Sequence, residues 1–503
     1  MSTVSWLEPL LDAERMRATD AWAIEQRGMA SLELMERAGA GLAALAAELA
    51  GEGRIVVLAG KGNNAGDGLV AARLLRSAGR EVEVVFAEDP AALTGDAAAN
   101  LERLPGDRPS VLAAGIAAPA PALVIDALLG TGATGAPRGA IAVAIAAIRD
   151  CGAAAVLAAD VPSGVDASTG EVAGDAVAAN ATATFHAAKP GLWIEPGRGH
   201  AGRVRVVDIG IPDGSPAEAD VGLIRDSVLE SVPRRGPGST KFTSGRVLVA
   251  GGSTGLTGAP SLAAMAAARA GAGYVTVCVP ASLSLVFETR LLEAMTIAVP
   301  DDGGAHTAEG VRAVVEAVSA RGGALVLGPG LGRRDGAREF ARGVLAAVEV
   351  PVVLDADGLN AFAADAASLG GRAAVLTPHA GELGRLLGVE SAEVERARLR
   401  FARAAAERTG GVVVLKGDDT LVACPGGEAA VSPGATAALA TAGTGDVLSG
   451  VIAAMLAKGL EPFAAACAGV RLHALAGIRA AALRGSVEGV IASDVVEALA
   501  GVR

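Results

Sequence analysis

The chain has 503 residues, a length that predicts two to four domains at about 100 to 200 residues each and excludes a small disulfide-stapled scaffold. Its formal charge of −12 at pH 7 argues against broad electrostatic capture of nucleic acid or of an anionic membrane. Hydrophobic residues make up 51% of the chain but aromatic residues only 2%. Small side chains, rather than lipid-facing helices, therefore account for the apolar composition.

The chain carries no pattern typical of a membrane span or a secretory signal. Long uncharged runs such as 109–125 and 251–268 are broken by proline or glycine, whereas a spanning helix needs about 20 apolar residues. The first twenty residues carry charges where a secretory signal needs an apolar stretch. Four widely spaced cysteines predict buried thiols rather than a metal or redox site. We therefore expect a soluble, cytoplasmic protein.

The first half of the chain alternates helical and strand patterns. Residues 14–51 predict two helices separated near Gly28. The run 54–60 then predicts a strand that ends in a glycine turn, followed by a helix and another strand. The same unit recurs within 122–164, so we expect an α/β domain with a mainly parallel sheet. Ligands of such sheets bind beyond the carboxyl ends of the strands.

The second half repeats this alternation with different motifs at the strand ends. Residues 226–244 lose the apolar periodicity and gather proline, glycine, serine and charge, which predicts a linker. Beyond it, strand and helix patterns restart at 246 and continue toward the C-terminus. We therefore predict two unrelated α/β domains, each a three-layer αβα sandwich, at residues 1–225 and 245–503.

Polar residues follow three predicted strands of the first domain. The sequence GKGNNAGDG at 60–68 joins a strand to a helix, where backbone NH groups and the helix dipole favour phosphate. A tight turn with glycine and asparagine at positive φ is the alternative interpretation. Asp126 ends the next strand, and Asp160 and Ser163 follow a third. Oxygen donors without a cysteine or histidine cluster suit a hard cation, although each aspartate alone could cap a helix or a turn.

These three motifs, with the helical SLELMERAG before them, resemble the NAD(P)H-hydrate epimerase domain over most of residues 10–215. The resemblance implies a Rossmann-like domain that interconverts the R and S forms of hydrated NADH or NADPH, with Asp160 as its acid or base. It implies potassium bound by Asn64, Asp126 and Ser163. It implies hydrate contacts from Asn63, Asn64, Ala65, Gly66, Asp67, Gly130, Thr131, Gly132, Ala133, Thr134, Gly135, Ala136 and Asp160. Ala65 replaces the family's usual glycine, which would weaken binding if this position required a positive φ.

Two motifs of the second domain point to phosphoryl transfer. Residues 441–456 predict a glycine turn that opens a long apolar helix with Asp446 in its first turn, where NH groups stabilise phosphoryl charge. An N-capping aspartate is the alternative interpretation. Lys416, one of only five lysines, ends a strand in a position to meet nucleotide phosphate, although a lone lysine is more often a surface charge. His379 lies between a strand and a helix, where a turn or core histidine is the alternative.

Together with glycine and carboxylate strand ends, these motifs resemble the ADP- or ATP-dependent NAD(P)H-hydrate dehydratases, which have a ribokinase-like fold, over about residues 240–500. The resemblance implies dehydration of the S form at the expense of ADP, giving AMP and phosphate, with magnesium on the nucleotide and Asp446 taking the hydroxyl proton. It implies hydrate contacts from Ala259, Gly330, His379 and Asp446. It implies nucleotide contacts from Lys416, Gly417, Asp418, Asp419, Thr420 and Gly445.

The leading interpretation is a bifunctional metabolite-repair enzyme, since neither activity alone clears a mixture of both epimers. The alternative is a kinase of vitamin-precursor or sugar alcohols with a nucleotide-binding regulatory first domain, and a third is a nucleotide-sensing scaffold. Free phosphate would indicate the dehydratase, and phosphate retained on the product would indicate the kinase. Family analogy also implies a homo-oligomer. The sequence leaves the choice between ADP and ATP, and between NADH and NADPH hydrate, open.

Overall fold

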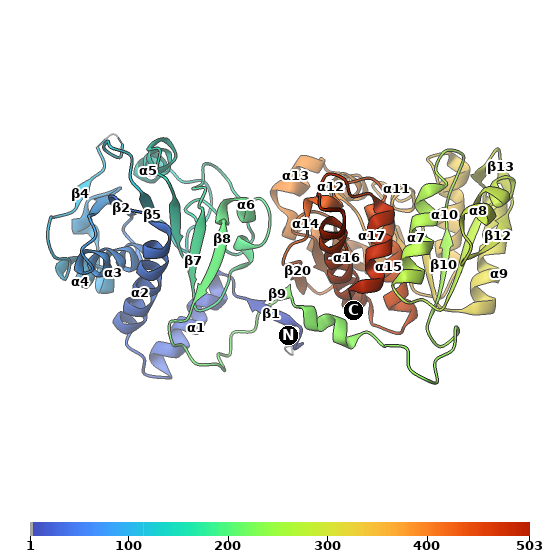
Figure 1. The fold of residues 1–503 in the computed structure, drawn as a ribbon, viewed down its shortest axis with the longest axis horizontal. Helices are drawn as coiled ribbons and strands as arrows, with labels where there is room; N and C mark the ends of the chain where they lie inside the picture. Colours follow the sequence, from blue (N-terminus) through green and yellow to red (C-terminus); the bar gives the residue numbers. More distant parts are fainter. Residues whose placement is uncertain (1–3, 114, 503) are drawn as a thin grey trace. The chain divides into compact units, whose positions relative to one another are not determined.

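The structure, a computed structural model, describes residues 4–113 and 115–502. It divides into two compact units, whose elements are labelled in Figure 1. The first unit consists of Pro9–Val221, and the second of Gly222–Arg503 together with the chain up to Glu8. The described part of the chain thus passes from the second unit into the first and returns to the second.

The first unit is built on a seven-stranded sheet in which every pair of neighbours is parallel. Its strands, in spatial order, are β4 (Ser110–Val111), β3 (Val82–Phe86), β2 (Ile55–Ala59), β5 (Leu123–Ala127), β6 (Val156–Ala159), β7 (Ala181–Phe185) and β8 (Arg203–Val207). The central strands are continuous apolar runs because both faces of a parallel sheet are covered. The strand order reverses between β2 and β5, and ligands of open α/β sheets bind at such a point.

Helices cover both faces of this sheet. They are α1 (Ala13–Glu25), α2 (Ser31–Leu49), α3 (Asn63–Ser77), α4 (Gly95–Glu102), α5 (Gly139–Asp150) and α6 (Gly197–Ala201). Ile55 and Val57 point toward the core shared with α2 and α3, whereas Val56 and Leu58 point toward α5. The alternation along β2 therefore fills two cores, and the unit has three layers.

The second unit is built on an eleven-stranded mixed sheet. Its strands, in spatial order, are β1 (Leu7–Leu10), β9 (Val221–Ile224), β20 (Ala429–Val431), β19 (Leu421–Ala423), β18 (Val412–Leu415), β17 (Val375–Leu376), β16 (Val352–Leu354), β15 (Ala324–Leu327), β10 (Arg246–Ala250), β11 (Tyr274–Pro280) and β12 (Met295–Val299). The seven strands from β18 to β12 are parallel, and β19 and β20 pair antiparallel. The order of the parallel strands reverses between β15 and β10.

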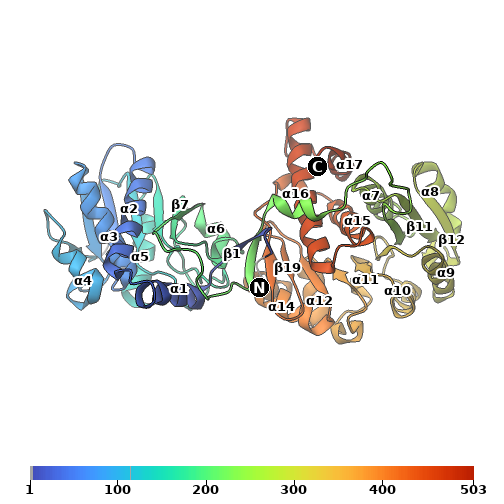
Figure 2. The same cartoon turned by 90° about the horizontal axis from the view of Figure 1, so that it is seen from below.

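Two groups of helices flank this sheet on opposite faces (Figure 2). One face carries α7 (Gly258–Arg269), α15 (Thr444–Ala457), α16 (Pro462–Arg484) and α17 (Ala492–Ala498). The remaining helices are α8 (Ser284–Arg290), α9 (Val311–Arg321), α10 (Asp335–Ala347), α11 (Asp357–Asn360), α12 (Ala380–Leu387), α13 (Ser391–Arg396) and α14 (Arg398–Thr409), and a hairpin joins β13 (Asp301–Asp302) to β14 (Ala305–His306). The predicted α/β class with three layers in each domain is confirmed.

Several strands, at the sheet edges and within the sheets, were not predicted. β8 alternates arginine with valine and is partly exposed, and β19 and β20 have three residues each, so none carries the long apolar run that identified the predicted strands. β1 joins the second sheet although more than two hundred residues separate it from β9. The Trp6 ring lies 5.9 Å from the Phe463 ring of α16, which fixes this segment to the second unit.

The predicted linker 226–244 lies within the second unit, and its first part is packed. A 3₁₀ turn, η3 (Asp226–Ser231), buries Val228 completely and lies against α16. Asp226 pairs with Arg471 over 2.5 Å. Two buried residues among polar neighbours, Val228 and Val232, are too few to produce a helical or strand periodicity, which is why the sequence pattern does not reveal this contact.

One helix, α16, is long and apolar enough to cross a membrane by length and composition alone. Most of it is buried against α15, α17 and η3, which is the packing of a core helix.

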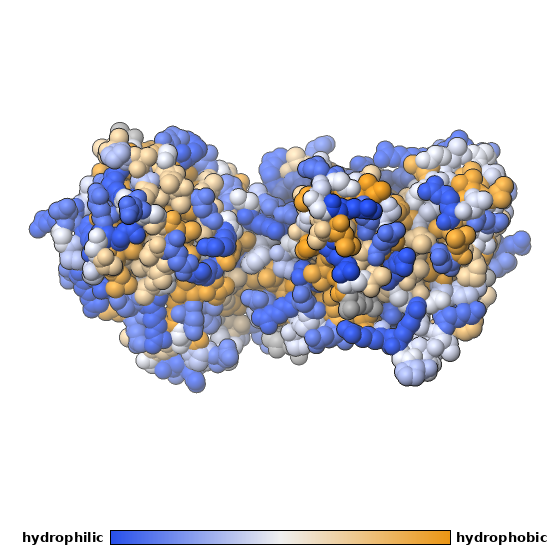
Figure 3. Space-filling model, viewed as in Figure 1, coloured by the Kyte–Doolittle hydropathy of each residue, from blue (hydrophilic) through white to orange (hydrophobic). Residues whose placement is uncertain are grey.

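On the face drawn in Figure 3, hydrophilic side chains are spread over both units with apolar residues between them.

Candidate active sites

The first unit has a cavity of about 750 Å³ at the carboxyl ends of β2, β5, β6 and β7, where the strand order reverses. The predicted residues that line it are Asn63, Asn64, Asp67, Gly130, Thr131, Gly132, Ala133 and Asp160. An adjoining cavity of about 320 Å³ is lined by the predicted Thr134, Gly135 and Ala136. Most of the hydrate-binding set therefore surrounds one continuous region, as expected at such a point in the sheet.

Ala65 and Gly66 do not line either cavity, because α3 begins inside the GKGNNAGDG motif at Asn63. Helical spacing places Asn63, Asn64 and Asp67 on the cavity side and turns the two residues between them into the core. A side chain on Gly66 would collide with Met35, whose Sδ lies 2.5 Å from the ideal Cβ position. Ala65 is fully buried in helical conformation, so the position does not require a positive φ.

The three predicted potassium ligands are brought together behind this cavity. Ser163 Oγ donates to Asp126 Oδ1 over 2.7 Å, and the Ser163 amide donates to Oδ2 over 2.8 Å. Leu129 joins them to Asn64, because its amide donates to Ser163 Oγ (3.0 Å) and its carbonyl oxygen accepts from Asn64 Nδ2 (2.8 Å). Burial raises the pKa of Asp126 to about 6 against the hydrogen bonds from Ser163.

A hard cation fits this donor set. Asn64 Oδ1 is buried and has no hydrogen-bond partner among the residues that the structure describes. A buried polar oxygen without a partner is costly, and a cation or a water molecule would satisfy it. The carboxylate of Asp126 and the oxygens of Ser163 and Leu129 belong to the same hydrogen-bonded cluster as Asn64. These are the neutral and anionic oxygens that hard cations prefer.

Asp160 lies at the end of β6 with its backbone at φ +65°, an uncommon conformation for a non-glycine residue. Its carboxylate pairs with Lys189, whose Nζ lies 2.6 Å from Asp160 Oδ1. Lys189 is almost completely buried and reaches the site from the segment that follows β7. A carboxylate held by a buried ammonium at the wall of a cavity is the arrangement expected of a catalytic acid or base.

Two further carboxyl groups line the same cavity, Asp20 from α1 and Asp67 from α3. Burial, with Asp160 nearby, raises the pKa of Asp20 to about 6, and Lys189 opposes the shift. Burial raises the pKa of Asp67 well above its ordinary value, and Asp160 adds to the effect. The site therefore places two carboxyl groups with raised pKa values beside a carboxylate that is paired with an ammonium, an arrangement suited to proton transfer in both directions.

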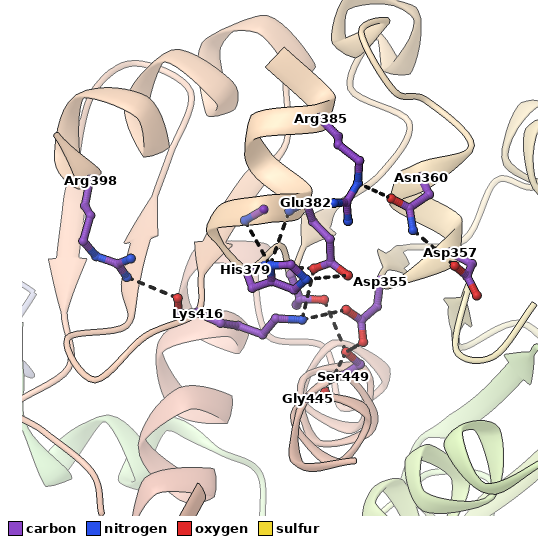
Figure 4. Close-up of polar contacts among 12 residues, drawn as sticks. Asp355, Asp357, Asn360, His379, Glu382, Arg385, Arg398, Lys416, Gly445 and Ser449 are labelled. Atoms are coloured by element: carbon purple, nitrogen blue, oxygen red, sulfur yellow. Dashed lines mark hydrogen bonds and ion pairs between the residues drawn. The ribbon is translucent and has the colours of Figure 1, made fainter. Parts of the chain in front are cut away.

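The second unit gathers charged residues at the ends of β16, β17 and β18 (Figure 4). Lys416 Nζ lies 3.1 Å from Asp355 Oδ1 and 3.5 Å from Glu382 Oε2. Asp355 Oδ2 accepts a hydrogen bond of 2.6 Å from Ser449 Oγ of α15. Burial lowers the pKa of Lys416, but the two carboxylates outweigh it and raise this pKa above its ordinary value.

His379 is the N-cap of α12. Its Nδ1 accepts from the amide of Gly381 over 3.0 Å, while Glu382 Oε2 accepts from the His379 amide over 2.9 Å. Nε2 lies 3.6 Å from Glu382 Oε1, and the ring is about half exposed. The capping box explains why TPHAGE ends a strand and begins a helix, and it leaves the ring edge at the surface of the site.

Asp446 lies in the first turn of α15, as predicted. Burial, with Asp355 nearby, raises the pKa of Asp446 to about 7, and Lys416 opposes the shift. A carboxylate with this pKa can accept a proton near neutral pH. Gly443 begins the helix at φ +94°, and a side chain on Gly445 would lie 3.4 Å from Lys416 Nζ, so the glycine turn leaves room between the lysine and the helix.

The remaining predicted hydrate contacts lie where the strand order reverses. Gly330 follows β15 with φ +67°, and a Cβ there would lie 2.5 Å from the Leu256 carbonyl oxygen and 3.5 Å from Ala259 Cβ. Ala259 is in the first turn of α7, beside Gly330. Asp357 Oδ2 accepts from the amide of Gly332 over 2.9 Å, which fixes this loop. The structure therefore brings Gly330 and Ala259 together, as the resemblance implied.

A cavity of about 570 Å³ lies beside this cluster. Of the predicted nucleotide contacts, it is lined by Lys416, Gly417, Asp418, Thr420 and Gly445. The predicted nucleotide contact of Asp419 is wrong, because this residue does not line the cavity. Its buried carboxylate forms a two-point pair with Arg398, with Nη2 to Oδ1 at 2.7 Å and Nε to Oδ2 at 2.9 Å. Arg398 also donates to the Lys416 carbonyl oxygen over 3.2 Å, so Asp419 supports the loop from behind.

Sequence reasoning missed four residues of these sites: Asp20, Lys189, Glu382 and Ser449. Lys189 is one of only five lysines in an arginine-rich chain, and this scarcity was the signal that could have found it. Glu382 lies three residues after His379, so the capping-box pattern marked it. Asp20 lies in a charged helix that carries no such signal, and only the fold brings it to the cavity.

Two protein-family models match the chain. Residues 247–500 match the model described as NAD(P)H-hydrate dehydratase, and residues 31–191 match the YjeF-related protein N-terminus. The first match covers the second unit, and its family is the one for which a ribokinase-like fold was predicted. The second lies within the first unit and includes α3, Asp126, Asp160 and Lys189.

Full-length relatives carry one name, bifunctional NAD(P)H-hydrate repair enzyme Nnr. The chain is 41% identical to that of Salinibacter ruber, over 94% of this chain and 92% of the relative. It is 39% identical to that of Moorella thermoacetica (97% and 96%) and 35% identical to that of Escherichia coli K12 (97% and 92%). A solved structure of the ADP/ATP-dependent NAD(P)H-hydrate dehydratase from Bacillus subtilis, co-crystallized with ATP/Mg²⁺, is 29% identical over 54% of this chain and 93% of that chain, with a TM-score of 0.46.

Proposed function

The chain belongs to the bifunctional NAD(P)H-hydrate repair enzymes, and from this premise we propose which residues carry each of its two activities. The first domain epimerises hydrated NADH or NADPH at the cavity around Asp160. The second dehydrates the S form beside Asp446 at the expense of a nucleotide phosphoryl group. The observation that carries this proposal is that each site places a carboxylate beside a lysine. Asp160 pairs with Lys189 in the first domain, and Lys416 pairs with Asp355 and lies near Asp446 in the second.

Epimerisation requires the hydroxyl-bearing carbon of the reduced, hydrated ring to lose and regain its oxygen. Asp160 transfers the proton of the hydroxyl group. The substrate can reach it because the cavity of about 750 Å³ that Asp160 lines has room for the ring and its ribose. Asp20 and Asp67 supply or accept the second proton, because both line the cavity and have raised pKa values. The start of α3 and the glycine-rich segment Gly130–Gly132 bind the phosphates through backbone NH groups.

Asn64, Asp126 and Ser163 would hold the potassium ion. When bound, the ion supplies positive charge next to the nucleotide phosphates. The residues themselves fix the loop after β5, because Asn64 and Ser163 both hydrogen-bond to Leu129. The unpartnered Asn64 Oδ1 supports this assignment.

Dehydration needs a better leaving group than hydroxide. Asp446 takes the proton of the hydrate's hydroxyl group while the oxygen of that group attacks the terminal phosphorus of the nucleotide. The bond between this phosphorus and the departing nucleotide breaks. The carbon–oxygen bond of the phosphorylated hydrate then breaks, phosphate leaves, and the neighbouring ring carbon loses a proton, which restores the dihydropyridine. The amides at the start of α15 face the transferred group, and Lys416 meets the nucleotide phosphates.

Magnesium accompanies the nucleotide in this proposal. The carboxylates of Asp355, Glu382 and Asp446 outnumber the single ammonium of Lys416, so an anionic nucleotide needs additional positive charge there. Glu382 would hold the ion, since both oxygens of Asp355 already accept from Lys416 and Ser449. The bound ion neutralises charge on the phosphates.

The test incubates the protein with both epimers of NADH hydrate, magnesium, potassium and either ADP or ATP, while dihydropyridine absorbance and free phosphate are followed. Complete conversion of both epimers, with one phosphate released per ring restored, is the expected result, and the better nucleotide identifies the donor. The same assay with NADPH hydrate identifies the preferred substrate. Phosphate retained on an organic product would indicate the kinase alternative.

Single variants separate the two activities. Asp160→Asn should stop conversion once the S form is consumed, after subtraction of the spontaneous epimerisation. Asp446→Asn should leave the epimers equilibrating without restoring dihydropyridine. If either variant lowered the rate of the other domain's reaction, this would contradict the assignment of the residues.

We also propose a cytoplasmic homo-oligomer that binds neither nucleic acid nor membrane. The net charge of −12 and the burial of α16 within the second unit support the absence of these two partners. Family analogy supports the oligomer. Light scattering of the purified protein gives the number of subunits, and fractionation of cells gives the compartment.

A further inference from the structure

We propose that Lys189 is a positioning residue of the epimerase site, which fixes Asp160 so that one defined oxygen of its carboxylate faces the substrate. This inference rests on the proposed function of the first domain. It concerns a residue that reaches the cavity wall from the segment after β7, outside the three motifs that identified the site.

The ammonium of Lys189 has no donor left for a ligand. Its three hydrogen bonds go to Asp160 Oδ1 (2.6 Å), Thr184 Oγ1 (2.9 Å) and the Phe185 carbonyl oxygen (2.9 Å). An ammonium has three N–H groups, so the protein itself uses all of them. With 1% of its side chain exposed, Lys189 cannot turn toward a substrate without losing these partners.

The same contacts act on only one side of the Asp160 carboxylate. Oδ1 accepts from Lys189, from Thr184 Oγ1 over 3.1 Å and from the Phe185 amide over 3.3 Å. Oδ2 has no such partner in the described part of the chain, and Asp160 lines the cavity. Three donors on one oxygen hold the carboxylate in a single orientation, and the other oxygen is the one free to exchange a proton with a hydroxyl group.

The charge of Lys189 serves the same purpose. Two further carboxyl groups face it, Asp20 from α1 and Asp67 from α3, and His186 precedes it on the same segment. Burial and Lys189 both lower the pKa of His186, so the lysine is the cation that balances Asp160. Without it, Asp160 would be one of three neighbouring carboxyl groups in a half-enclosed cavity, and proton uptake would be favoured.

The experiment measures the rate at which purified R epimer is converted to the S form, as a function of pH, in the full chain with the uncatalysed rate subtracted. For Lys189→Met we expect the acid limb of the profile to move up by about 1 to 3 pH units, the effect of removing an opposite charge from a carboxylate. We expect kcat to fall while KM for the hydrate stays unchanged, because the lysine has no donor for the substrate.

The matched control is Thr184→Val, which removes a neutral donor from the same Asp160 oxygen. It should lower kcat and move the acid limb less than Lys189→Met does, because a neutral donor stabilises the carboxylate less than an ammonium does, which separates the charge of Lys189 from general damage to the site. A Lys189→Met profile that coincides with that of the unaltered chain would overturn the inference. If the unaltered chain does not epimerise at all, the proposed function fails instead, so the two failures are distinguishable.

A second variant covers the case in which Lys189→Met does not fold. Lys189→Ala leaves a space at the wall of the open cavity, and added ethylammonium, which donates hydrogen bonds, should restore part of the rate in a saturable way. Tetramethylammonium, which has no N–H group, should not. Equal effects of the two ions, or none from either, would contradict a role through hydrogen bonds to Asp160.

Discussion

Lys189 in the first domain and Lys416 in the second each lie beside a carboxylate near the carboxyl ends of parallel strands, but the N–H groups of the two lysines have different partners. All three N–H groups of Lys189 donate to protein atoms, and its side chain is almost completely buried. Lys416 makes one hydrogen bond to Asp355 and an ion pair with Glu382, lines a cavity and keeps 21% of its side chain exposed. A lysine without a free donor can act only through its neighbours, whereas one with a free donor can bind a ligand.

Arg398 extends the comparison to a buried cation that lines neither of the two site cavities described above, and its removal should show the largest effect on stability. Arg398→Ala removes the arginine that pairs with the fully buried Asp419, which should cost about 3 to 5 kcal/mol of unfolding free energy. Denaturant unfolding measures the loss. Arg342→Ala is the matched control, because its pair with Asp365 is exposed and should contribute less than about 1 kcal/mol. Equal losses in both variants would contradict this account.

The free donor of Lys416 predicts the next largest effect. Lys416→Met should raise the KM for ADP by about 10- to 100-fold, since a hydrogen bond to a charged group contributes about 1.5 to 3 kcal/mol and about 1.4 kcal/mol is tenfold. Steady-state kinetics at saturating hydrate measures it. Lys458→Met is the control, because Lys458 donates to the Pro233 carbonyl oxygen, outside the cavity. An unchanged KM in Lys416→Met would contradict a direct nucleotide contact.

The smallest effect is a pH dependence in the second domain. Burial raises the pKa of Asp446 to about 7, and only its ionised form can take the hydroxyl proton. As pH falls through this value the protonated form accumulates, so kcat/KM for dehydration should decrease about tenfold per pH unit below 7. A profile recorded from pH 5 to 9 at constant ionic strength checks this. A rate that stays constant from pH 8 down to pH 5 would show that Asp446 is not the base.

Much of the fold was predictable because parallel strands covered on both faces read as continuous apolar runs. β2, β5, β10 and β18 were all identified in this way. The edge strands were not, because β8 alternates charge with valine and β1 is joined to its neighbour only through the folded sheet. Contacts between distant segments leave no periodicity in the sequence.

The candidate sites were predictable where a residue belongs to a sequence motif, at a strand end for Asp126 and Asp160 and in the first turn of a helix for Asp446. The structure corrected Ala65 and Gly66, because helical geometry turns them away from the cavity, and Asp419, because a buried arginine holds it. Whether a motif residue points to the ligand or to the core depends on side-chain direction, which spacing alone does not give when the start of the helix is unknown.

The short strand β1 has a consequence for how these domains can be separated. Because the chain enters the second sheet before it forms the first domain, the first domain is an insertion with two covalent junctions to the second. A gene cut at the predicted linker would remove β1 and β9 from the second domain, uncover the edge of β20 and leave Phe463 without the Trp6 ring. The dehydratase half is therefore best obtained by excising residues 11–220 and rejoining the flanking strands β1 and β9 through a short turn, rather than by truncation.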